Sequence, residues 1–575
     1  MSTDNRRQAQ QQSNQRLAPS SINRHPRNIS IVVQGSFFVV VLTFLAAPDL
    51  LSSTPKASDR LDVVGIPTGT IQETEAVQTP AEEFDQAMKA GAVALQNGDN
   101  AGAIAAFAKA VQLSPDHPLA LTQLGRAKLE LGDFEEALDL LLLATTLAPD
   151  NFVTTFNLGT GLLRVRRYQE ALGALDAAAQ ADPADPMVRY GQALALAELG
   201  SHADAITRLE EAVTLAPELA NAWMLLGRLL IEHRGDLESV LRATAAYESA
   251  LELRPRSGEA CLALGRAYRR LTFHEKTLAL VDECQAAGSR DPNLELLRGR
   301  ALRQMGMPSE ARSAFEAAAI RGSVEAHFEL GVQARAQGDL DVAVKEFEAV
   351  VRMRPRRALA YVRLAEVHID RLAYASAEEL LRRVLRMQAC CVAQAHNLLG
   401  FALYKTGDLD GAVAHGREAI KLNAELKQAH YNLALALRDS GKREQSHQVI
   451  QRFQELTDAE DQRELQENRA MQLGLLNAQG LYYFRRDDPT QALKLFETAV
   501  EFAPDDALIH LNIGLSKAAL GQHQGAIVAL ERSLALQPER AETYTILAAA
   551  YRVVGQAEDA QRIDELRRQI EGRNE

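Results

Sequence analysis

The chain has 575 residues, of which 47% are hydrophobic and only 5% aromatic, and its formal net charge is −13. Alanine and leucine carry most of the apolar content, which favours closely packed helices over sheets rich in valine, isoleucine and aromatic residues. The negative charge excludes bulk attraction to nucleic acid, and four cysteines without C-x-x-C spacing are too few for a disulfide framework.

Residues 1–28 form a basic, Gln-rich tail with five Arg and one Asp, a net charge of +4 that leaves about −17 for the remainder. An uncharged, mostly apolar run follows over residues 29–47, and its 19 positions are close to the ~20 that a helix needs to cross a bilayer. Positive charge precedes the run and mixed charge follows it, so the positive-inside rule keeps the tail cytoplasmic. We therefore predict a single-pass transmembrane signal anchor, with the rest of the chain across the membrane.

Two other interpretations of this run remain open. A cleaved signal peptide is one, because Leu45, Ala46 and Ala47 resemble a small-residue cleavage site, although Pro48 would then follow the cut. A buried core helix is the other. It is disfavoured because recurrent Pro, Ser and Thr after the run are typical of an extended chain. Residues 48–83 are accordingly predicted to be a disordered linker.

From about residue 84 the sequence repeats every 34 residues. Each unit has a small residue in a first predicted helix and, in most units, an alanine twelve residues later in a second. The small residues are Gly91, Gly125, Gly159, Ala193, Gly227, Gly265, Gly299, Gly331, Ala365, Gly400, Ala434, Gly480, Gly514 and Ala548. Fourteen units result.

Glycine inside a helix costs about 1 kcal/mol relative to alanine, so its recurrence indicates a close approach of two helices. Gly98, Gly132, Gly338 and Gly407, each followed by Asp, are suited to end a first helix in a left-handed conformation. A proline closes eight of the units, because proline cannot continue a helix. The units are therefore predicted to be antiparallel helical hairpins.

The pattern resembles the tetratricopeptide-repeat family over about 490 of the 575 residues. The best-preserved unit contains Trp223, Leu226 and Gly227, then Ala243, Tyr247, Ala250 and Pro255. The resemblance implies an all-α, right-handed superhelical solenoid of about 14 helical hairpins, in which the first helices line a concave groove for partner proteins or extended peptides. The unit of Cys261 and Cys284, and the unit ending near Asp458, depart from the pattern, so we expect altered packing there.

The interval between Ser446 and Ala492 is 46 residues rather than 34. About twelve extra residues, 461–472, are charged and helix-prone, so we predict a helical insertion. It divides the array into about eleven repeats over 84–460 and about three over 473–575, where an amphipathic C-terminal helix caps the array.

No pattern in the chain has catalytic spacing, and none of G-x-S-x-G, H-E-x-x-H or a Gly-rich phosphate loop occurs. We expect no enzyme activity, no cofactor and no metal site. His327, His396, His430 and His510 lie four residues before the small residue of their units. Their recurrence is compatible with a metal site, but the preferred interpretation is that each histidine replaces the Trp or Tyr found at this position in other units.

Cys261 and Cys284 belong to one predicted hairpin. They would form a disulfide in an oxidising compartment, but the preferred interpretation is that they are small buried hydrophobic residues. Cys390 and Cys391 are assigned no role.

In the family that the repeat resembles, positions just before and after the small residue contact ligands. Guanidinium groups at these positions suit carboxylates, so the groove is expected to bind an acidic segment or a carboxyl terminus of a partner. The alternative is a solvated helix face whose arginines pair with nearby glutamates. The arginines are Arg126, Arg228, Arg266, Arg269, Arg300, Arg303, Arg335 and Arg363, and the secondary candidates are Asn157, Asn432 and Asn512.

These features predict a non-catalytic, membrane-anchored scaffold or adaptor for protein partners, in assembly of a bacterial envelope complex. The alternative is a substrate-recruiting or regulatory subunit of a separately encoded transferase or hydrolase. The expected location is the bacterial inner membrane, with the N-terminus cytoplasmic and the repeat array periplasmic, or the periplasm after signal cleavage.

Overall fold

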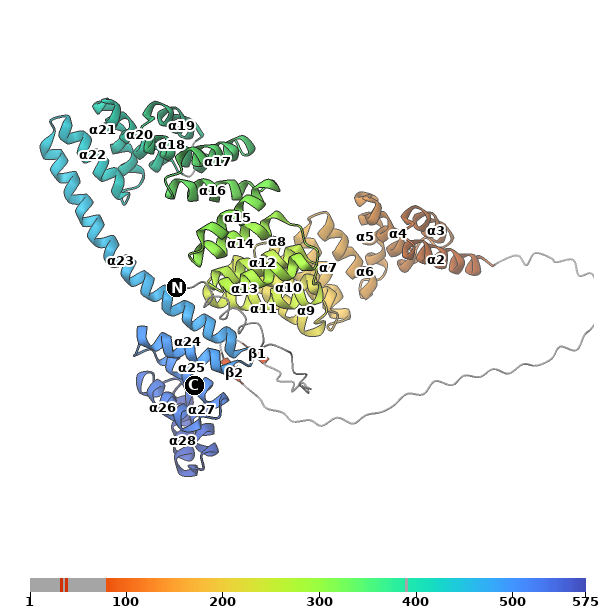
Figure 1. The fold of residues 1–575 in the computed structure, drawn as a ribbon. Coiled ribbons are helices and arrows are strands. Elements are labelled where there is room, and N and C mark those ends of the chain that lie inside the picture. Colours follow the sequence, from red (N-terminus) through yellow and green to blue (C-terminus); the bar gives the residue numbers. More distant parts are fainter. Residues whose placement is uncertain (1–31, 35–36, 40–78, 388–390, 575) are drawn as a thin grey trace, which may run out of the picture. The chain divides into compact units, whose positions relative to one another are not determined.

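The computed structural model describes residues 32–34, 37–39, 79–387 and 391–574 (Figure 1). The chain divides into two units, residues 1–75 and 76–575. In the first unit, β1 (Val32–Gln34) pairs antiparallel with β2 (Phe37–Val39), and Val32 lies opposite Val39. Both strands fall within residues 29–47, so the predicted membrane helix is wrong for these six residues.

The difference has a simple source, because a short apolar run rich in Val, Ile and Phe favours a strand as readily as a helix. The other residues of 29–47, the tail and residues 48–78 lie outside the described residues. Among the helices that the structure describes, none combines the length and the apolar character needed to cross a membrane.

Over residues 79–387 and 391–574 the second unit consists of 27 helices in consecutive antiparallel hairpins, as the all-α prediction requires (Figure 1). The first half of the array comprises α2 (Pro80–Gln96), α3 (Asn100–Leu113), α4 (Pro118–Leu131), α5 (Phe134–Leu147), α6 (Phe152–Arg164), α7 (Tyr168–Ala181), α8 (Pro186–Glu198), α9 (His202–Leu215), α10 (Ala220–His233), α11 (Leu237–Leu253), α12 (Gly258–Arg270), α13 (His274–Ala286), α14 (Pro292–Gln304) and α15 (Pro308–Ile320). The second half comprises α16 (Val324–Ala336), α17 (Leu340–Met353), α18 (Ala358–Asp370), α19 (Tyr374–Met387), α20 (Val392–Thr406), α21 (Leu409–Leu422), α22 (Lys427–Asp439), α23 (Arg443–Phe484), α24 (Pro489–Phe502), α25 (Ala507–Ala519), α26 (His523–Leu536), α27 (Ala541–Val553) and α28 (Ala557–Asn574).

The first helix begins earlier than predicted. Thr79 and Glu82 form a capping box, in which each side chain bonds the backbone N–H of the other residue, and Pro80 occupies the first helical position. The predicted linker over 48–83 therefore extends four residues too far, since Pro80 starts a helix instead of prolonging an extended segment.

The glycines that were predicted to end first helices have the expected left-handed conformation. Gly132 and Gly407 are left-handed caps, and Gly98 and Gly338 also have positive φ.

The recurrent glycines lie where the two helices of a hairpin meet. A Cβ on Gly299 would lie 2.4 Å from the ring of Phe315 on α15, and one on Gly91 would lie 2.5 Å from Phe107 on α3. The predicted close approach is confirmed, but at these hairpins the neighbour is a large buried side chain of the second helix and not its backbone. Glycine thus makes room for the residue that fills the core of the repeat.

The hairpin of α12 and α13 is packed differently, as its sequence predicts. A Cβ on Gly265 would meet Leu297 of α14 at 2.1 Å, so the next repeat fills the space that the second helix fills elsewhere. Cys261 and Cys284 join the two helices in a disulfide. The preferred interpretation, small buried hydrophobic residues in place of a disulfide, is therefore wrong: both cysteines are buried, but they are bonded.

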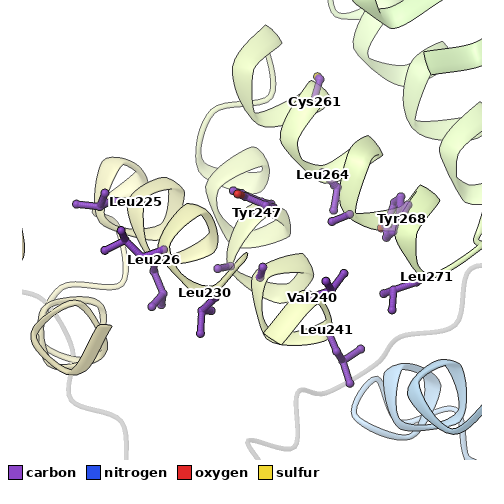
Figure 2. Close-up of a cluster of buried hydrophobic side chains, with 14 of the residues drawn as sticks. Leu225, Leu226, Leu230, Val240, Leu241, Tyr247, Cys261, Leu264, Tyr268 and Leu271 are labelled. Carbon is purple, nitrogen blue, oxygen red and sulfur yellow. The ribbon is translucent and has the colours of Figure 1, made fainter. Parts of the chain in front are cut away.

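Helix α23 has 42 residues and belongs to two hairpins. Its beginning packs on α22 as the second helix of the eleventh repeat, and its end packs on α24 as the first helix of the twelfth. The predicted insertion 461–472 lies inside this helix, and the residues with described side chains over 458–472 are exposed. Ala478 and Tyr482, near its end, join a hydrophobic cluster with α10 to α14, part of which is shown in Figure 2.

Candidate functional site

The predicted groove arginines lie on the first helices of five consecutive repeats. Along this part of the array α12 contacts α14 and α16 contacts α18, and hydrogen bonds join α14 to α16, so residues from these successive repeats come together. Arg228 lies on α10, Arg266 and Arg269 on α12, Arg300 and Arg303 on α14, Arg335 on α16 and Arg363 on α18. The exposed Arg126 lies apart from this group, on α4.

Two arginines on α14 hold one buried carboxylate of the next repeat. Glu329 on α16 is only 8% exposed, and it accepts from Arg300 Nε at 2.7 Å and from Arg303 Nη1 at 2.5 Å. Burial pushes the pKa of Glu329 upward, but the charges and hydrogen bonds of Arg303 and Arg300 outweigh it and hold this pKa below its usual value. Both guanidinium groups are therefore largely engaged within the array.

A second acidic centre engages the arginines on α16 and α18. Glu366, 6% exposed, accepts from Arg335 Nη1 at 2.5 Å and from Arg363 Nη1 at 2.9 Å. Arg335 also donates from Nε to Asp370 at 2.6 Å, and Gln394 on α20 donates to Glu366 at 2.8 Å. Burial lowers the pKa of Arg335, but the bond to Asp370 and the charges of Glu366 and Asp370 raise it overall. These contacts are the pairing that the solvated-face alternative describes.

Arg228 and Arg266 differ from the paired arginines of α14, α16 and α18. Both side chains are exposed, and none of the described residues places an acid within ion-pair distance of either. The charges of both arginines act on the buried Tyr247 of α11 and lower its pKa. Burial and the charge of Glu232 outweigh them and raise the pKa of Tyr247 to about 12. Two unpaired guanidinium groups therefore flank one tyrosine.

Arg269 connects this pair to the α14 arginines. It is half-buried, and its Nε has no hydrogen-bond partner. Burial is the main cause that lowers the pKa of Arg269, and the positive charge of Arg300 is the next. Arg303 and Arg266 lower this pKa further, whereas the charge of Glu329 raises it. Arg228, Arg266 and Arg269, which we call the open arginine cluster, thus have no carboxylate within ion-pair distance among the described residues.

The asparagines of the groove pair with one another between repeats. Asn432 donates to Asn397 and Asn512 donates to Asn477, each at 2.9 Å and across 35 residues. Asn157 instead donates to the carbonyl of Val153 in its own helix, at 2.7 Å. The structure therefore does not bring the three predicted asparagines together.

Sequence reasoning missed the acids and the partner asparagines of the groove. Glu329 precedes its small residue by two positions and Glu366 follows its own directly, while Asn397 and Asn477 precede theirs by three. A search of groove positions for every polar residue, and not for Arg and Asn at selected offsets, would have found all four.

Two of the recurrent histidines form the hydrogen bond that Trp223 forms at the equivalent position of its own repeat. His430 Nε2 donates to the carbonyl of Ala424 at 2.9 Å and His510 Nε2 to that of Pro504 at 2.8 Å, each six residues earlier. Trp223 Nε1 makes the same bond to Pro217 at 2.8 Å, so replacement of an aromatic residue is confirmed at these two positions.

The other two histidines pair with the second helix of their hairpin. His327 Nδ1 lies 2.6 Å from Glu346, and His396 Nδ1 lies 2.8 Å from Nδ1 of His415. Within the described part of the chain, no group of three or more His, Cys, Asp or Glu has the arrangement to hold a metal ion.

Stacked helical hairpins with a polar inner face define this molecule as a helical-repeat solenoid. Models of the family described as Tetratricopeptide repeat match residues 94–152, 156–219, 296–338, 331–390, 373–427 and 477–561, which together exceed half of the chain. The chain therefore belongs to the tetratricopeptide-repeat family. No curated protein matches it in sequence.

Several solved structures are similar in part. MamA 41-end from Desulfovibrio magneticus RS-1 is 23% identical, with coverage of 31% of this chain and 98% of that one and a TM-score of 0.28. The APC/C hetero-tetramer Cut9-Hcn1 is 14% identical, with coverage of 81% and 96% and a TM-score of 0.33. A tetratricopeptide repeat protein from Parabacteroides merdae ATCC 43184 is 17% identical, with coverage of 42% and 94% and a TM-score of 0.31. At these values the likeness carries no conclusion about partners.

Proposed function

We propose that this chain is a non-catalytic scaffold or adaptor whose groove holds an acidic segment or a carboxyl terminus of a partner protein. The observation that carries the proposal is the open arginine cluster. The four groove arginines of α14, α16 and α18 already bind Glu329 or Glu366, whereas Arg228, Arg266 and Arg269 have no carboxylate within ion-pair distance among the described residues. A guanidinium group binds a carboxylate through two parallel hydrogen bonds, so a partner carboxylate would complete this cluster.

The proposal includes a place for the array outside the cytoplasm. Disulfides persist in oxidising compartments and are rare in the cytosol, and the bond between Cys261 and Cys284 therefore supports a periplasmic location. A role in a bacterial envelope complex rests on the sequence alone, and anchoring through a helix over residues 29–47 is not part of the proposal, because β1 and β2 lie there. Reporter fusions to the C-terminus test the location: activity confined to the cytoplasm would contradict it.

The groove is tested by reversing charge at its exposed arginines. A double variant, Arg228→Glu with Arg266→Glu, removes two donors that no described acid needs, so the fold is expected to survive. The probe is a fluorescent decapeptide of alternating Glu and Ala, with either a free or an amidated carboxyl terminus. Each lost charged hydrogen bond is worth about 1.5 kcal/mol, so affinity is expected to fall about tenfold or more per arginine.

The matched control is Arg256→Glu with Arg290→Glu, which makes the same charge change at exposed positions between helices. If the control weakens the peptide as much as the groove variant does, only net charge matters and the groove proposal fails. Loss that is confined to the free-acid peptide assigns the cluster to a terminal carboxylate. Equal loss for both peptides assigns it to acidic side chains.

A further inference from the structure

The end of α23 lies against helices that precede it by more than two hundred residues. Gln479 Nε2 donates to the carbonyl oxygen of Leu271 at 2.7 Å and to Oγ1 of Thr272 at 2.8 Å, across separations of 208 and 207 residues. We call the contact of residues 474–486 with α11, α12 and α13 the α23 dock. It joins the twelfth repeat to the fifth and sixth.

The centre of the α23 dock is aromatic and buried. The ring centroids of Phe273 and Tyr482 are 4.7 Å apart, and Tyr268 meets Tyr482 edge-on at 6.3 Å. All three residues are at least nine-tenths buried. Both tyrosine hydroxyls donate to the same carboxylate oxygen of Glu248, at 2.5 Å and 3.0 Å. Burial of aromatic rings with satisfied hydroxyls is typical of a specific interface.

Charged groups surround this centre. Lys276 Nζ lies 5.1 Å from the ring centroid of Tyr482 and 5.2 Å from that of Tyr483. Arg485 pairs with Glu238 at 3.0 Å, and Arg486 forms an ion pair with Glu248. Salt screens the more exposed pair of Arg485 and Glu238 much more than the aromatic packing or the buried carboxylate of Glu248, so that pair is the salt-sensitive part of the dock.

The turn of the sixth repeat takes part in the α23 dock. Thr272 has a φ of 57°, a left-handed conformation that also occurs at Arg166, Leu372 and Asp487, so the conformation alone does not mark the dock. The feature that belongs to the dock is the hydrogen bond that the hydroxyl of Thr272 accepts from Gln479.

The middle of α23 contributes no comparable packing. Over residues 458–472 the described side chains are exposed. Their contacts are at the surface: the ion pairs of Glu460 with Lys427 and of Arg463 with Glu425, and the hydrogen bond from Arg469 to the carbonyl oxygen of Phe502. The described part of this segment buries no apolar side chain, and segments of that kind are the ones that open locally at the lowest free energy.

We propose that the α23 dock is a reversible latch. Closed, it ties the twelfth repeat to the fifth and sixth and so fixes the curvature of the repeats between them. Open, with residues 458–472 locally unfolded, those repeats are held only by their immediate neighbours. The inference does not depend on what the groove binds, because every contact that carries it lies outside the open arginine cluster.

A cross-linking experiment on the full chain tests closure. Thr272→Cys and Gln479→Cys are combined, with Cys390 and Cys391 changed to Ser, and disulfide formation is followed by peptide mapping under mild oxidation. The control pair is Thr272→Cys with Gln466→Cys, whose second site is about 20 Å away along the helix. The latch predicts cross-linking that is about tenfold or more faster in the first pair. Equal rates would overturn it.

Opening is tested by Tyr482→Ser in the same cross-linking background and alone in X-ray scattering. We expect a cross-linking rate that falls about tenfold and a larger radius of gyration, with helix content unchanged. Tyr551→Ser is the matched control, because Tyr551 donates to Glu531 across 20 residues, as Tyr268 does to Glu248, but in the last repeat. An unchanged rate and radius in folded Tyr482→Ser would contradict the latch.

Discussion

Replacing Glu329 with Gln should destabilise the array. The variant no longer has to bury a carboxylate charge, but it leaves Arg300 and Arg303 without their acidic partner. Glu329 is 8% exposed and is the common acceptor of Arg300 and Arg303. Removing one partner of a fully buried ion pair costs about 3–5 kcal/mol. The two arginine side chains are 29% and 36% exposed, and water compensates them in part, so we expect a loss of about 2 kcal/mol.

Amide hydrogen exchange over α14 to α16 is the appropriate assay, because a repeat array need not unfold in one step. Glu316→Gln is the control, since Glu316 pairs with Arg312 at exposed positions and should cost no more than about 0.5 kcal/mol. The pKa of Glu329 is lowered by folding, so its stabilisation is present above the unfolded value of about 4.3 and is lost as pH falls through the lower, folded value. Equal effects of the two variants at neutral pH would refute the reasoning.

Three further predictions concern packing, covalent structure and pH. Gly299→Ala should destabilise its hairpin by about 1–3 kcal/mol, because the added Cβ would lie 2.4 Å from the buried ring of Phe315. The control is Gly173→Ala, at an exposed helical position with open space, which should instead stabilise its helix by about 0.5–1 kcal/mol in thermal unfolding. Changing Cys261 and Cys284 together to Ala should cost about 3 kcal/mol through the loop that the disulfide closes, and a loss confined to other repeats in hydrogen exchange would contradict this. Burial lowers the pKa of both histidines that pair between α20 and α21, so their neutral forms stabilise the fold above pH of about 6.5 and this contribution falls below it. Exchange in α20 and α21, corrected for intrinsic rates, should accelerate as pH falls from about 7 to 5, and His396→Phe should reduce that dependence without abolishing it, because burial still lowers the pKa of His415.

The repeat register was predictable because a single local rule governs it. A glycine in a first helix makes room for a large residue of the second, as Gly299 does for Phe315, and this rule recurs along the chain. The altered hairpin at Gly265 was predictable for the same reason, since its unit breaks the pattern. The strands at residues 32–34 and 37–39 were not, because an apolar run of this kind is compatible with either structure.

The contents of the groove were predictable only in part. Sequence spacing places arginines on first helices, but it does not say which of many acids each one meets. Arg300 meets Glu329, which lies on the next first helix two residues before Gly331. The matching position for Arg266 is Leu297, two residues before Gly299 on α14, and it offers no acid. The difference between paired and open arginines therefore depends on tertiary neighbours.

The α23 dock was the least predictable feature. Its two sides are separated by about two hundred residues, and repeat periodicity describes contacts only between adjacent units. One local sign was present in hindsight, namely paired tyrosines at 482 and 483 in an aromatic-poor chain.

The most direct test of the account is site-specific photo-cross-linking from the groove. A photoreactive amino acid is placed at position 266, in the open arginine cluster, or at position 312 on α15, and cross-linked partner peptides are sequenced from native cells. The account predicts that position 266 captures segments rich in Asp and Glu or ending in a free carboxyl terminus, and that position 312 does not. Capture of neutral or basic segments at position 266, or the same segments at both positions, would contradict it.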